Sequence, residues 1–301
     1  MNNIIESFTN VKRKIEHFNP DVLLLCIDFD GTLAKIQKNP YAAYLDIDHK
    51  KTIEKIADIE GIYYCIVTGR ELKDIKKRVG ISSNIIYSGN HGMEIESYYK
   101  DLKINFVAGG KQSGSFIKIV KKIEKDLRKI EIPGLIIENK KYSISLHCRM
   151  LSPENISKLK KETKEIIKSN KEYKALLHLK RGKKIVEVRP KFDWDKGKAC
   201  NYITGKLAVM HDIKSGGNIL NILRFSAGDD LTDETMFKDS RGAEYITTGA
   251  NVLNMGSVVG KKKSNADYYL DNYSQTYIIT EKITDLYRRL HNANDIYPKK
   301  R

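Results

Sequence analysis

The fold of this chain is decided by Val22-Leu23-Leu24-Leu25-Cys26-Ile27-Asp28-Phe29-Asp30-Gly31-Thr32. The first six residues are all apolar, which is typical of a strand in a parallel sheet that helices cover on both faces. Two carboxylates follow, at the end of the strand where an open α/β sheet places its chemistry. Side chains at i and i+2 of an extended strand point the same way, so we expect Asp28 and Asp30 to face one ligand. A turn of Asp and Gly with no ligand is the alternative.

Composition places the chain among ordinary globular proteins. Its 301 residues are 41% apolar, which is enough for a large core. Because the usual domain has about 100–200 residues, we expect two domains. No window approaches the roughly 18 uninterrupted apolar residues of a membrane span, and residues 1–18 lack the apolar region of a signal peptide. The four cysteines are far apart, which favours buried reduced thiols over a zinc site or disulfides. We therefore expect a cytoplasmic protein with no membrane partner.

The net charge of +16 comes mostly from one part of the chain. Between residues 111 and 184 there are 21 lysines and arginines and 8 acidic residues. Residues 118–128 carry apolar side chains at helical spacing with lysines between them, which is typical of a helix with one face in solvent. A basic funnel for an anionic substrate is the second interpretation. Nucleic-acid binding is the third, but no RNA-binding aromatic motif, zinc finger or basic zipper accompanies the charge, so we expect no nucleic-acid partner.

Strands and helices alternate at both ends of the chain. This order implies right-handed crossovers and a parallel sheet. We expect strands at 22–27, 61–67, 84–88 and 222–227, and helices at 4–18, 47–59, 71–79 and 196–210.

The middle of the chain has a different order, which predicts a small α+β module inserted into the sheet domain. Its expected elements are helices at 115–129 and 153–169 and strands at 134–138, 143–147, 175–179 and 184–188. We divide the chain into an N-terminal helix (1–20), a core (21–109 and 190–295), an inserted domain (110–189) and a basic tail (296–301).

Three of the expected strands end in polar residues, namely Asp28 and Asp30, Thr68, and Asp229, Asp230 and Asp233. The carboxyl ends of parallel strands meet at one edge of the sheet, so one site should contain them all. Oxygen ligands without His or Cys suit Mg²⁺, which would relieve the repulsion between close carboxylates. With the Thr68 hydroxyl, the amides near Gly31 and the Lys196 ammonium, such an ion would form a cradle for a phosphoryl group. One of the leading carboxylates can then attack phosphorus, while the other protonates the leaving oxygen and later deprotonates water.

These motifs resemble those of the haloacid dehalogenase superfamily and, more narrowly, of its trehalose-phosphatase family. The resemblance covers nearly all of residues 23–271. It rests on Asp28-Phe-Asp-Gly-Thr-Leu33, Thr68-Gly-Arg70, Gly89-Asn-His-Gly92 with Glu94, Glu187-Val-Arg-Pro190, Lys196-Gly197 and Gly228-Asp-Asp-Leu-Thr-Asp-Glu234. Two positions depart from the family pattern: Thr68 stands where Ser is frequent, and Cys148 where an aromatic residue is more usual.

The resemblance implies a fold and a set of catalytic roles. The fold would be α/β, a Rossmann-like parallel-sheet core of the haloacid dehalogenase type with an inserted α+β cap domain. Asp28 would be the nucleophile that forms an aspartyl-phosphate, Asp30 the general acid and base, Thr68 a phosphate ligand and Lys196 a neutralising cation. Mg²⁺ would be bound by Asp28, the carbonyl of Asp30 and Asp229, with Asp230 and Asp233 as supports that bind it through water or hold its ligands.

The substrate implied by the resemblance is a sugar phosphate, trehalose 6-phosphate, read by the cap. The expected sugar contacts are Arg70, Asn90, His91, Glu138, Lys140, His147, Arg149, Lys183 and Glu187. A satisfied core histidine is the alternative for His147, and a solvated strand end is the alternative for Glu138 and Lys140.

Other functions stay open at this stage. Sucrose-phosphate phosphatase and mannosyl-3-phosphoglycerate phosphatase share the expected fold and reaction, although 89–92 and 187–190 favour trehalose phosphate. A phosphomutase would form the same aspartyl-phosphate but transfer the group to a second sugar. A binding protein without activity is disfavoured, because it has no need of a nucleophile beside an acid.

Overall fold

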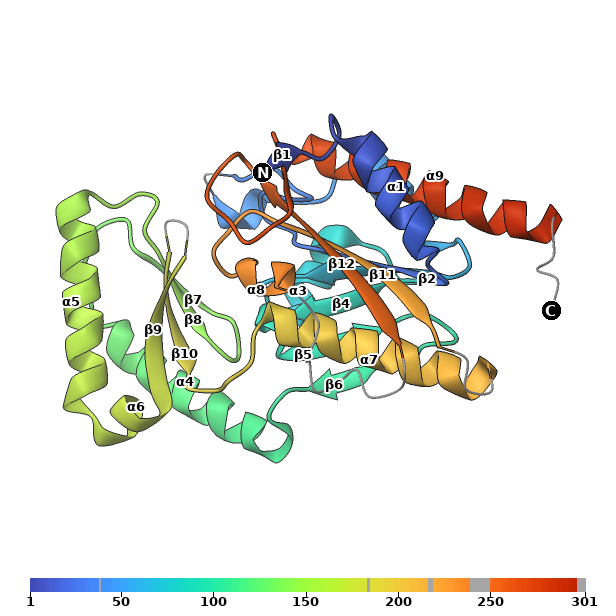
Figure 1. Ribbon diagram of the computed structural model, residues 1–301. Coiled ribbons are helices and arrows are strands. Elements are labelled where there is room, and N and C mark those ends of the chain that lie inside the picture. Colours follow the sequence, from blue (N-terminus) through green and yellow to red (C-terminus); the bar gives the residue numbers. More distant parts are fainter. Residues whose placement is uncertain (38, 183–184, 216–218, 239–249, 297–301) are drawn as a thin grey trace.

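The structure is a computed structural model that describes residues 1–37, 39–182, 185–215, 219–238 and 250–296. A nine-stranded sheet forms its larger part, in the order β1-β13-β12-β11-β2-β3-β4-β5-β6 (Figure 1). The strands are β1 (Asn2–Asn3), β2 (Val22–Ile27), β3 (Ile62–Val67), β4 (Ile86–Gly89), β5 (Glu94–Ser97), β6 (Asn105–Val107), β11 (Asn221–Gly228), β12 (Asn251–Val259) and β13 (Tyr268–Leu270). In this order, all neighbouring strands between β1 and β4 are parallel, which confirms the predicted parallel sheet. Strands β5 and β6 add an antiparallel edge.

Strand β2 divides its side chains between two apolar cores, because alternate residues of a strand point to opposite faces. Leu23, Leu25 and Ile27 pack with one set of helices, and Val22, Leu24 and Cys26 with the other. The first set comprises α1 (Phe8–Phe18), α2 (Ile47–Ala57), α3 (Leu72–Val79) and α9 (Ser274–Ile296), and the second α7 (Lys196–Ser215) and α8 (Glu234–Phe237). The uninterrupted apolar run of β2 thus reflects burial on both faces.

A second, four-stranded antiparallel sheet has its own apolar core, made by residues such as Ile119, Leu146 and Leu159. It lies beside the large sheet in Figure 1, with order β7-β8-β10-β9. Its elements are α4 (Ser113–Leu127), β7 (Ile136–Asn139), β8 (Ile144–His147), α5 (Pro153–Ser169), α6 (Lys171–Leu176), β9 (Leu177–Gly182) and β10 (Ile185–Pro190). Short 3₁₀ turns lie at Pro40–Ala42, Asn90–Gly92 and Gly110–Gln112.

Two expectations about the elements were wrong. The N-terminal helix begins at Phe8 rather than at residue 4, because Asn2 and Asn3 pair with Tyr268 and Tyr269 as a short strand. Residues 175–176 end helix α6, whose start is capped by the Asn170 side chain, so the strand expected at 175–179 begins at Leu177. Strands β1, β5, β6, β12 and β13 and helices α6, α8 and α9 were not predicted.

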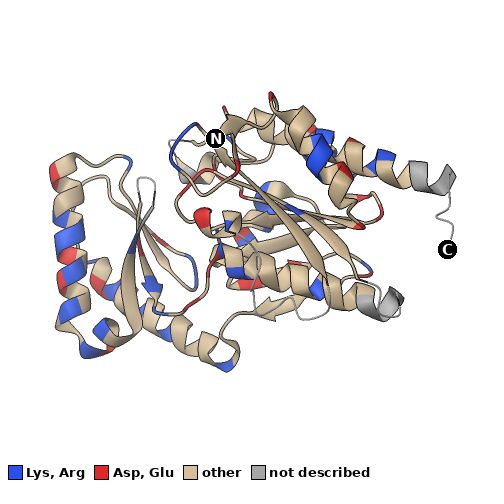
Figure 2. Cartoon of the chain, in the orientation of Figure 1, with Lys and Arg blue, Asp and Glu red and all other residues tan. Residues whose placement is uncertain are grey.

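The basic residues of the second sheet's helices lie mostly in solvent. Figure 2 shows Lys and Arg along α5, and Lys158, Lys161, Lys164 and Lys168 of that helix are exposed. This agrees with the solvated-face interpretation of the charge for α5. None of the helices described is both long and apolar enough to cross a bilayer.

Candidate active site

The two leading carboxylates follow strand β2 but differ in their surroundings. The Asp28 amide donates to the carbonyl of Ala227, which extends the pairing of β2 with β11 by one residue. The turn after it places Asp28 in the interior, with 5% of its surface exposed, whereas the Asp30 side chain is 40% exposed. Both line one pocket, as expected, but from different depths.

Lys196, the first residue of α7, lies between two buried carboxylates. Its ammonium is 2.6 Å from Oδ1 of Asp28 and 2.6 Å from Oδ1 of Asp233. The Thr32 hydroxyl donates to the other oxygen of Asp28 at 3.2 Å, and the Asp230 amide donates to the other oxygen of Asp233 at 2.8 Å. Oxygens of Asp28, Asp229 and Asp233 lie within 4.8 Å of one another, which is a spacing that a metal ion can bridge.

The electrostatics of this cluster favour a bound cation. Burial raises the pKa of Asp28 well above its ordinary value, and repulsion from Asp233 and Asp229 adds to the effect, while Lys196 opposes it. Burial works against the charge of Lys196, but Asp233 and Asp28 outweigh it and raise the lysine's pKa. Asp28 and Asp233 both pair with Lys196, and the carboxylates that line the cavity outnumber its lysines and arginines. The site therefore has an excess of negative charge that a divalent ion would offset.

Gly31 brings the loop after β2 against the carboxylate of Asp229. Its φ is +88°, and a Cβ placed on it would lie 2.4 Å from Oδ2 of Asp229. A side chain here would therefore be strained in backbone and would displace a candidate metal ligand.

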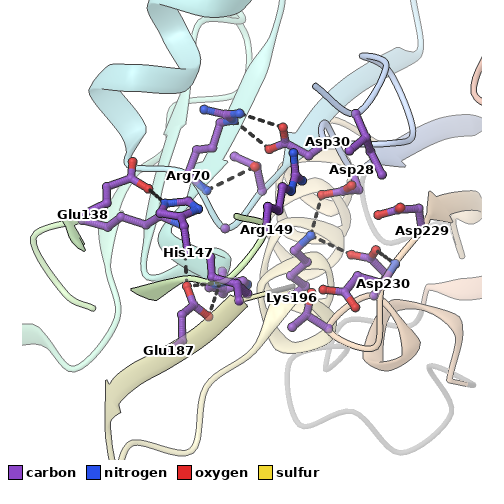
Figure 3. A pocket seen from close by; sticks show the side chains of 18 residues that line it. Asp28, Asp30, Arg70, Glu138, His147, Arg149, Glu187, Lys196, Asp229 and Asp230 are labelled. Carbon is purple, nitrogen blue, oxygen red and sulfur yellow. Dashed lines mark hydrogen bonds and ion pairs between the residues drawn. The ribbon is translucent and has the colours of Figure 1, made fainter. Parts of the chain in front are cut away.

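Arg70 binds the carboxylate of Asp30 through two hydrogen bonds. Its Nε and Nη2 each donate to one oxygen of Asp30 at 2.7 Å (Figure 3). Its Nη1 donates to Asp74 at 3.1 Å. The guanidinium also lies over the ring of Phe29, 5.6 Å from its centroid. Burial opposes the charge of Arg70, but Asp30 and Asp74 raise its pKa. Although we predicted Arg70 as a sugar contact, these three donors point to carboxylates.

The opposite wall of the pocket is a polar network that joins the two sheets. Nε2 of His91 lies 3.4 Å from Glu187, a residue of β10, and the Arg189 guanidinium contacts both. Burial and the charge of Arg189 lower the pKa of His91 to about 3, so its ring is neutral near pH 7. Burial works against the charge of Glu187, but Arg189, His91 and Lys140 lower its pKa well below the ordinary value.

A second pair on this wall joins β7 to β8. Nε2 of His147 is 2.8 Å from Oε2 of Glu138 (Figure 3). Burial opposes the charge of Glu138, but the hydrogen bond from His147 and the charge of Lys140 lower its pKa. His147 thus has one satisfied nitrogen and still lines the pocket.

Most of the predicted site residues come together around one cavity of about 140 Å³. Those that line it are Asp28, Asp30, Thr68, Arg70, His91, Glu138, Lys140, His147, Arg149, Glu187, Lys196, Asp229, Asp230 and Asp233. Asn90 does not line it, because its amide turns to Glu94 at 2.9 Å. Lys183 lies outside the described residues. Four lining residues were not predicted, namely Ile36, Gly69, Ile185 and Thr232. Arg189, which binds Glu187, was also missed, although it lies within the quoted motif at 187–190.

The chain is similar in sequence to a known family and to several of its members. Residues 26–274 match the family model described as trehalose-phosphatase. A probable trehalose-phosphate phosphatase E of Arabidopsis thaliana is 27% identical over 272 residues, which are 87% of this chain and 70% of the relative. The trehalose-phosphate phosphatase of Mycolicibacterium paratuberculosis is 27% identical over 87% of this chain and 62% of its own length.

Solved structures show the same fold. The C-terminal domain of trehalose-6-phosphate phosphatase of C. albicans superposes with a TM-score of 0.68 at 21% identity, over 91% of this chain and 96% of that one. A trehalose-6-phosphate phosphatase related protein superposes with a TM-score of 0.63 at 23% identity, over 88% and 99%. At such identities the likeness concerns the fold.

Proposed function

Because this chain belongs to the trehalose-phosphatase family, we infer that it is a phosphatase that hydrolyses trehalose 6-phosphate to trehalose and phosphate. The observation that carries this inference is the ion pair of Asp28 and Lys196 at the floor of a pocket whose opposite wall offers Glu138, His147 and Glu187. Carboxylates and imidazoles are hydrogen-bonding partners for sugar hydroxyls. One cavity therefore combines groups for phosphate chemistry with groups for sugar recognition.

We propose Mg²⁺ as the metal, because the candidate ligands are all oxygens and the buried site has an excess of negative charge. Asp28, Asp229 and the backbone carbonyl of Asp30 would bind it. Asp233 would hold the Lys196 ammonium and the backbone amide of Asp230 in place. When bound, the ion would neutralise charge on the phosphoryl group. The candidate ligands Asp28, Asp229 and Asp233 are all carboxylates, with no His or Cys among them, so they suit a hard cation.

The chain's own residues account for both halves of the reaction. Asp28 attacks phosphorus with a carboxylate oxygen, and the bond from phosphorus to the sugar oxygen breaks as Asp30 gives that oxygen a proton. Asp30 then takes a proton from a water molecule, which attacks the phosphorus and releases phosphate and free Asp28. Lys196 and the Thr68 hydroxyl stabilise the phosphoryl oxygens. Arg70 donates to both oxygens of Asp30, so one of these two hydrogen bonds must break or lengthen when Asp30 carries the proton.

We propose that the second sheet with its helices, residues 110–189, is the cap that reads the sugar. Its residues at the cavity are Glu138, Lys140, His147, Arg149 and Glu187. Its lysines on α5 face solvent, so charge attraction of the substrate would come from the cations at the cavity itself.

We propose a cytoplasmic location because the cysteines form no disulfides. All four cysteines, Cys26, Cys65, Cys148 and Cys200, are free and buried. Free thiols are typical of reducing compartments.

The function is tested by phosphate release from a panel of sugar phosphates with Mg²⁺ present. The panel contains trehalose 6-phosphate, sucrose 6-phosphate, mannosyl-3-phosphoglycerate and glucose 6-phosphate. We expect the highest kcat/KM with trehalose 6-phosphate and no requirement for a sugar bisphosphate, which a phosphomutase would need. Faster release from another substrate would keep the reaction and overturn the assignment of the sugar.

Gly31→Ala is expected to weaken binding of Mg²⁺ by about tenfold or more. The added methyl group would lie 2.4 Å from Oδ2 of Asp229 at a φ that disfavours alanine, so Asp229 would have to move. Isothermal titration calorimetry of the two proteins with Mg²⁺ measures the effect. Gly114→Ala is the control, because Gly114 lies in helix α4 with nothing within 4 Å of an added Cβ. Equal affinity for Mg²⁺ in wild type and Gly31→Ala would contradict the assignment of Asp229.

A further inference from the structure

An ion pair joins the two sheets beside the catalytic cavity, outside the residues assigned to substrate or metal. Lys141, in the turn between β7 and β8, donates to Oε1 of Glu94, the first residue of β5. Glu94 is 7% exposed. The pair therefore buries a carboxylate against the tip of a hairpin from the other sheet, which costs free energy unless the partner stays in place.

The backbone of Lys141 is held in an uncommon conformation. Its φ is +69°, a region that lysine adopts rarely, whereas the other described non-glycine residues with positive φ are asparagines and a histidine. The Asn139 side chain accepts from the Lys141 amide at 2.8 Å, and the Tyr142 amide donates to the Lys140 carbonyl at 2.8 Å. This tight turn directs the Lys141 ammonium across to Glu94.

Glu94 also holds the loop that carries His91. Its second oxygen accepts from the side-chain amide of Asn90 at 2.9 Å, and the Asn90 backbone amide donates to the carbonyl of Arg70 at 2.7 Å. Glu71 is close to the pair, since burial and then the charge of Glu94 raise its pKa. The ammonium of Lys141 thus acts on two carboxylates, that of Glu94 in β5 and that of Glu71 at the start of α3.

Two residues shortly before Lys141 in the chain reach the cavity. Glu138 and Lys140 line it, one from the end of β7 and one from the turn itself. Lys140 lies 3.6 Å from Glu187, and Glu138 is paired with His147. A shift of the hairpin tip would therefore move two groups that face the substrate.

We propose that Lys141 and Glu94 are positioning residues that hold the 138–141 hairpin over the sugar end of the cavity. They touch neither the carboxylates at the floor nor Lys196, so they act on sugar binding and leave the chemical step alone. This inference rests on the proposed phosphatase function and adds a specificity device to it.

The test compares a sugar phosphate with p-nitrophenyl phosphate, which has no sugar for the hairpin to hold. We expect Glu94→Gln and Lys141→Asn each to raise KM for trehalose 6-phosphate about tenfold, with kcat changed less than twofold and kcat/KM for p-nitrophenyl phosphate unchanged. Asn suits the positive φ, so Lys141→Asn removes the ammonium without straining the turn. The double variant should be no worse than either single one, because both remove the same contact.

Two controls make the comparison specific. Lys141→Arg keeps the charge and should retain a KM near that of wild type, and Lys161→Ala removes an exposed lysine of α5 and should change nothing. An unchanged KM in the Glu94 and Lys141 variants, or an equal loss with both substrates, would overturn the proposal. If wild type prefers another sugar phosphate of the panel, the assigned substrate fails, and the comparison is made with that sugar phosphate instead.

Discussion

Asp28→Asn is expected to lower kcat for trehalose 6-phosphate by about 10⁴-fold or more, as when other enzymes lose their nucleophile. An amide does not attack phosphorus. Its oxygen can still accept from Lys196, and its NH₂ can donate to the Thr32 hydroxyl, so the surrounding hydrogen bonds have replacements. Phosphate release under Mg²⁺ measures the loss, and a residual rate within tenfold of wild type would exclude Asp28 as the nucleophile.

Stability separates this loss from misfolding. Burial and Asp233 raise the pKa of Asp28 in the fold above its unfolded value. The stability linked to such a group is present below the unfolded pKa and is lost as the pH rises through the folded pKa. In EDTA near pH 7 the uncharged Asp28→Asn variant should therefore have a higher Tm than wild type. Thermal denaturation against pH checks this, and a lower Tm would contradict the excess of negative charge.

Asp30→Asn is expected to lower kcat for trehalose 6-phosphate by about 10²–10⁴-fold, the range for loss of a general acid or base. With p-nitrophenyl phosphate the leaving group needs no proton, so Asp28 should still be phosphorylated. Water attack then lacks its base. The variant should release about one p-nitrophenolate per enzyme quickly and then slow down, a burst that stopped-flow absorbance records.

The control for this variant is Asp74→Asn. Asp74 accepts from Arg70 and does not line the cavity, so its loss weakens the positioning of Asp30 without removing the acid. We expect less than about a tenfold change in kcat and no burst, because positioning is weakened while both proton transfers survive. Equal steady-state losses with both substrates in Asp30→Asn, without a burst, would assign Asp30 to a structural role.

The residues at the floor of the site could be predicted because each follows directly on an apolar run that marks its strand. An apolar run followed by Asp28 and Asp30 marks a strand and its carboxyl end, and the same holds at Thr68 and at Asp229. Parallel strands then bring these ends to one edge, whatever the details of the loops. The structure places these residues and Lys196 around one cavity.

The opposite wall could be predicted in part. Motif resemblance identified Glu138, His147 and Glu187, which do line the cavity. It also suggested Asn90, which does not line the cavity and whose amide donates to Glu94. Arg70 lines the cavity, but three of its donors bind Asp30 and Asp74. Which partner a long polar side chain selects depends on groups that are distant in sequence and close in space.

Sequence alone thus predicted the α/β class, the parallel strands at 22–27, 61–67, 84–88 and 222–227, the carboxylate floor and the reaction it serves. These features depend on apolar periodicity and on the polar residues at strand ends, which are visible in neighbouring residues. Tertiary structure decided the N-terminal strand at Asn2–Asn3, the antiparallel edge of β5 and β6, and the links from one sheet to the other through His91, Arg189 and the pair of Lys141 with Glu94. These features arise from pairing and charge contacts between segments dozens of residues apart, and no short-range pattern specifies such contacts.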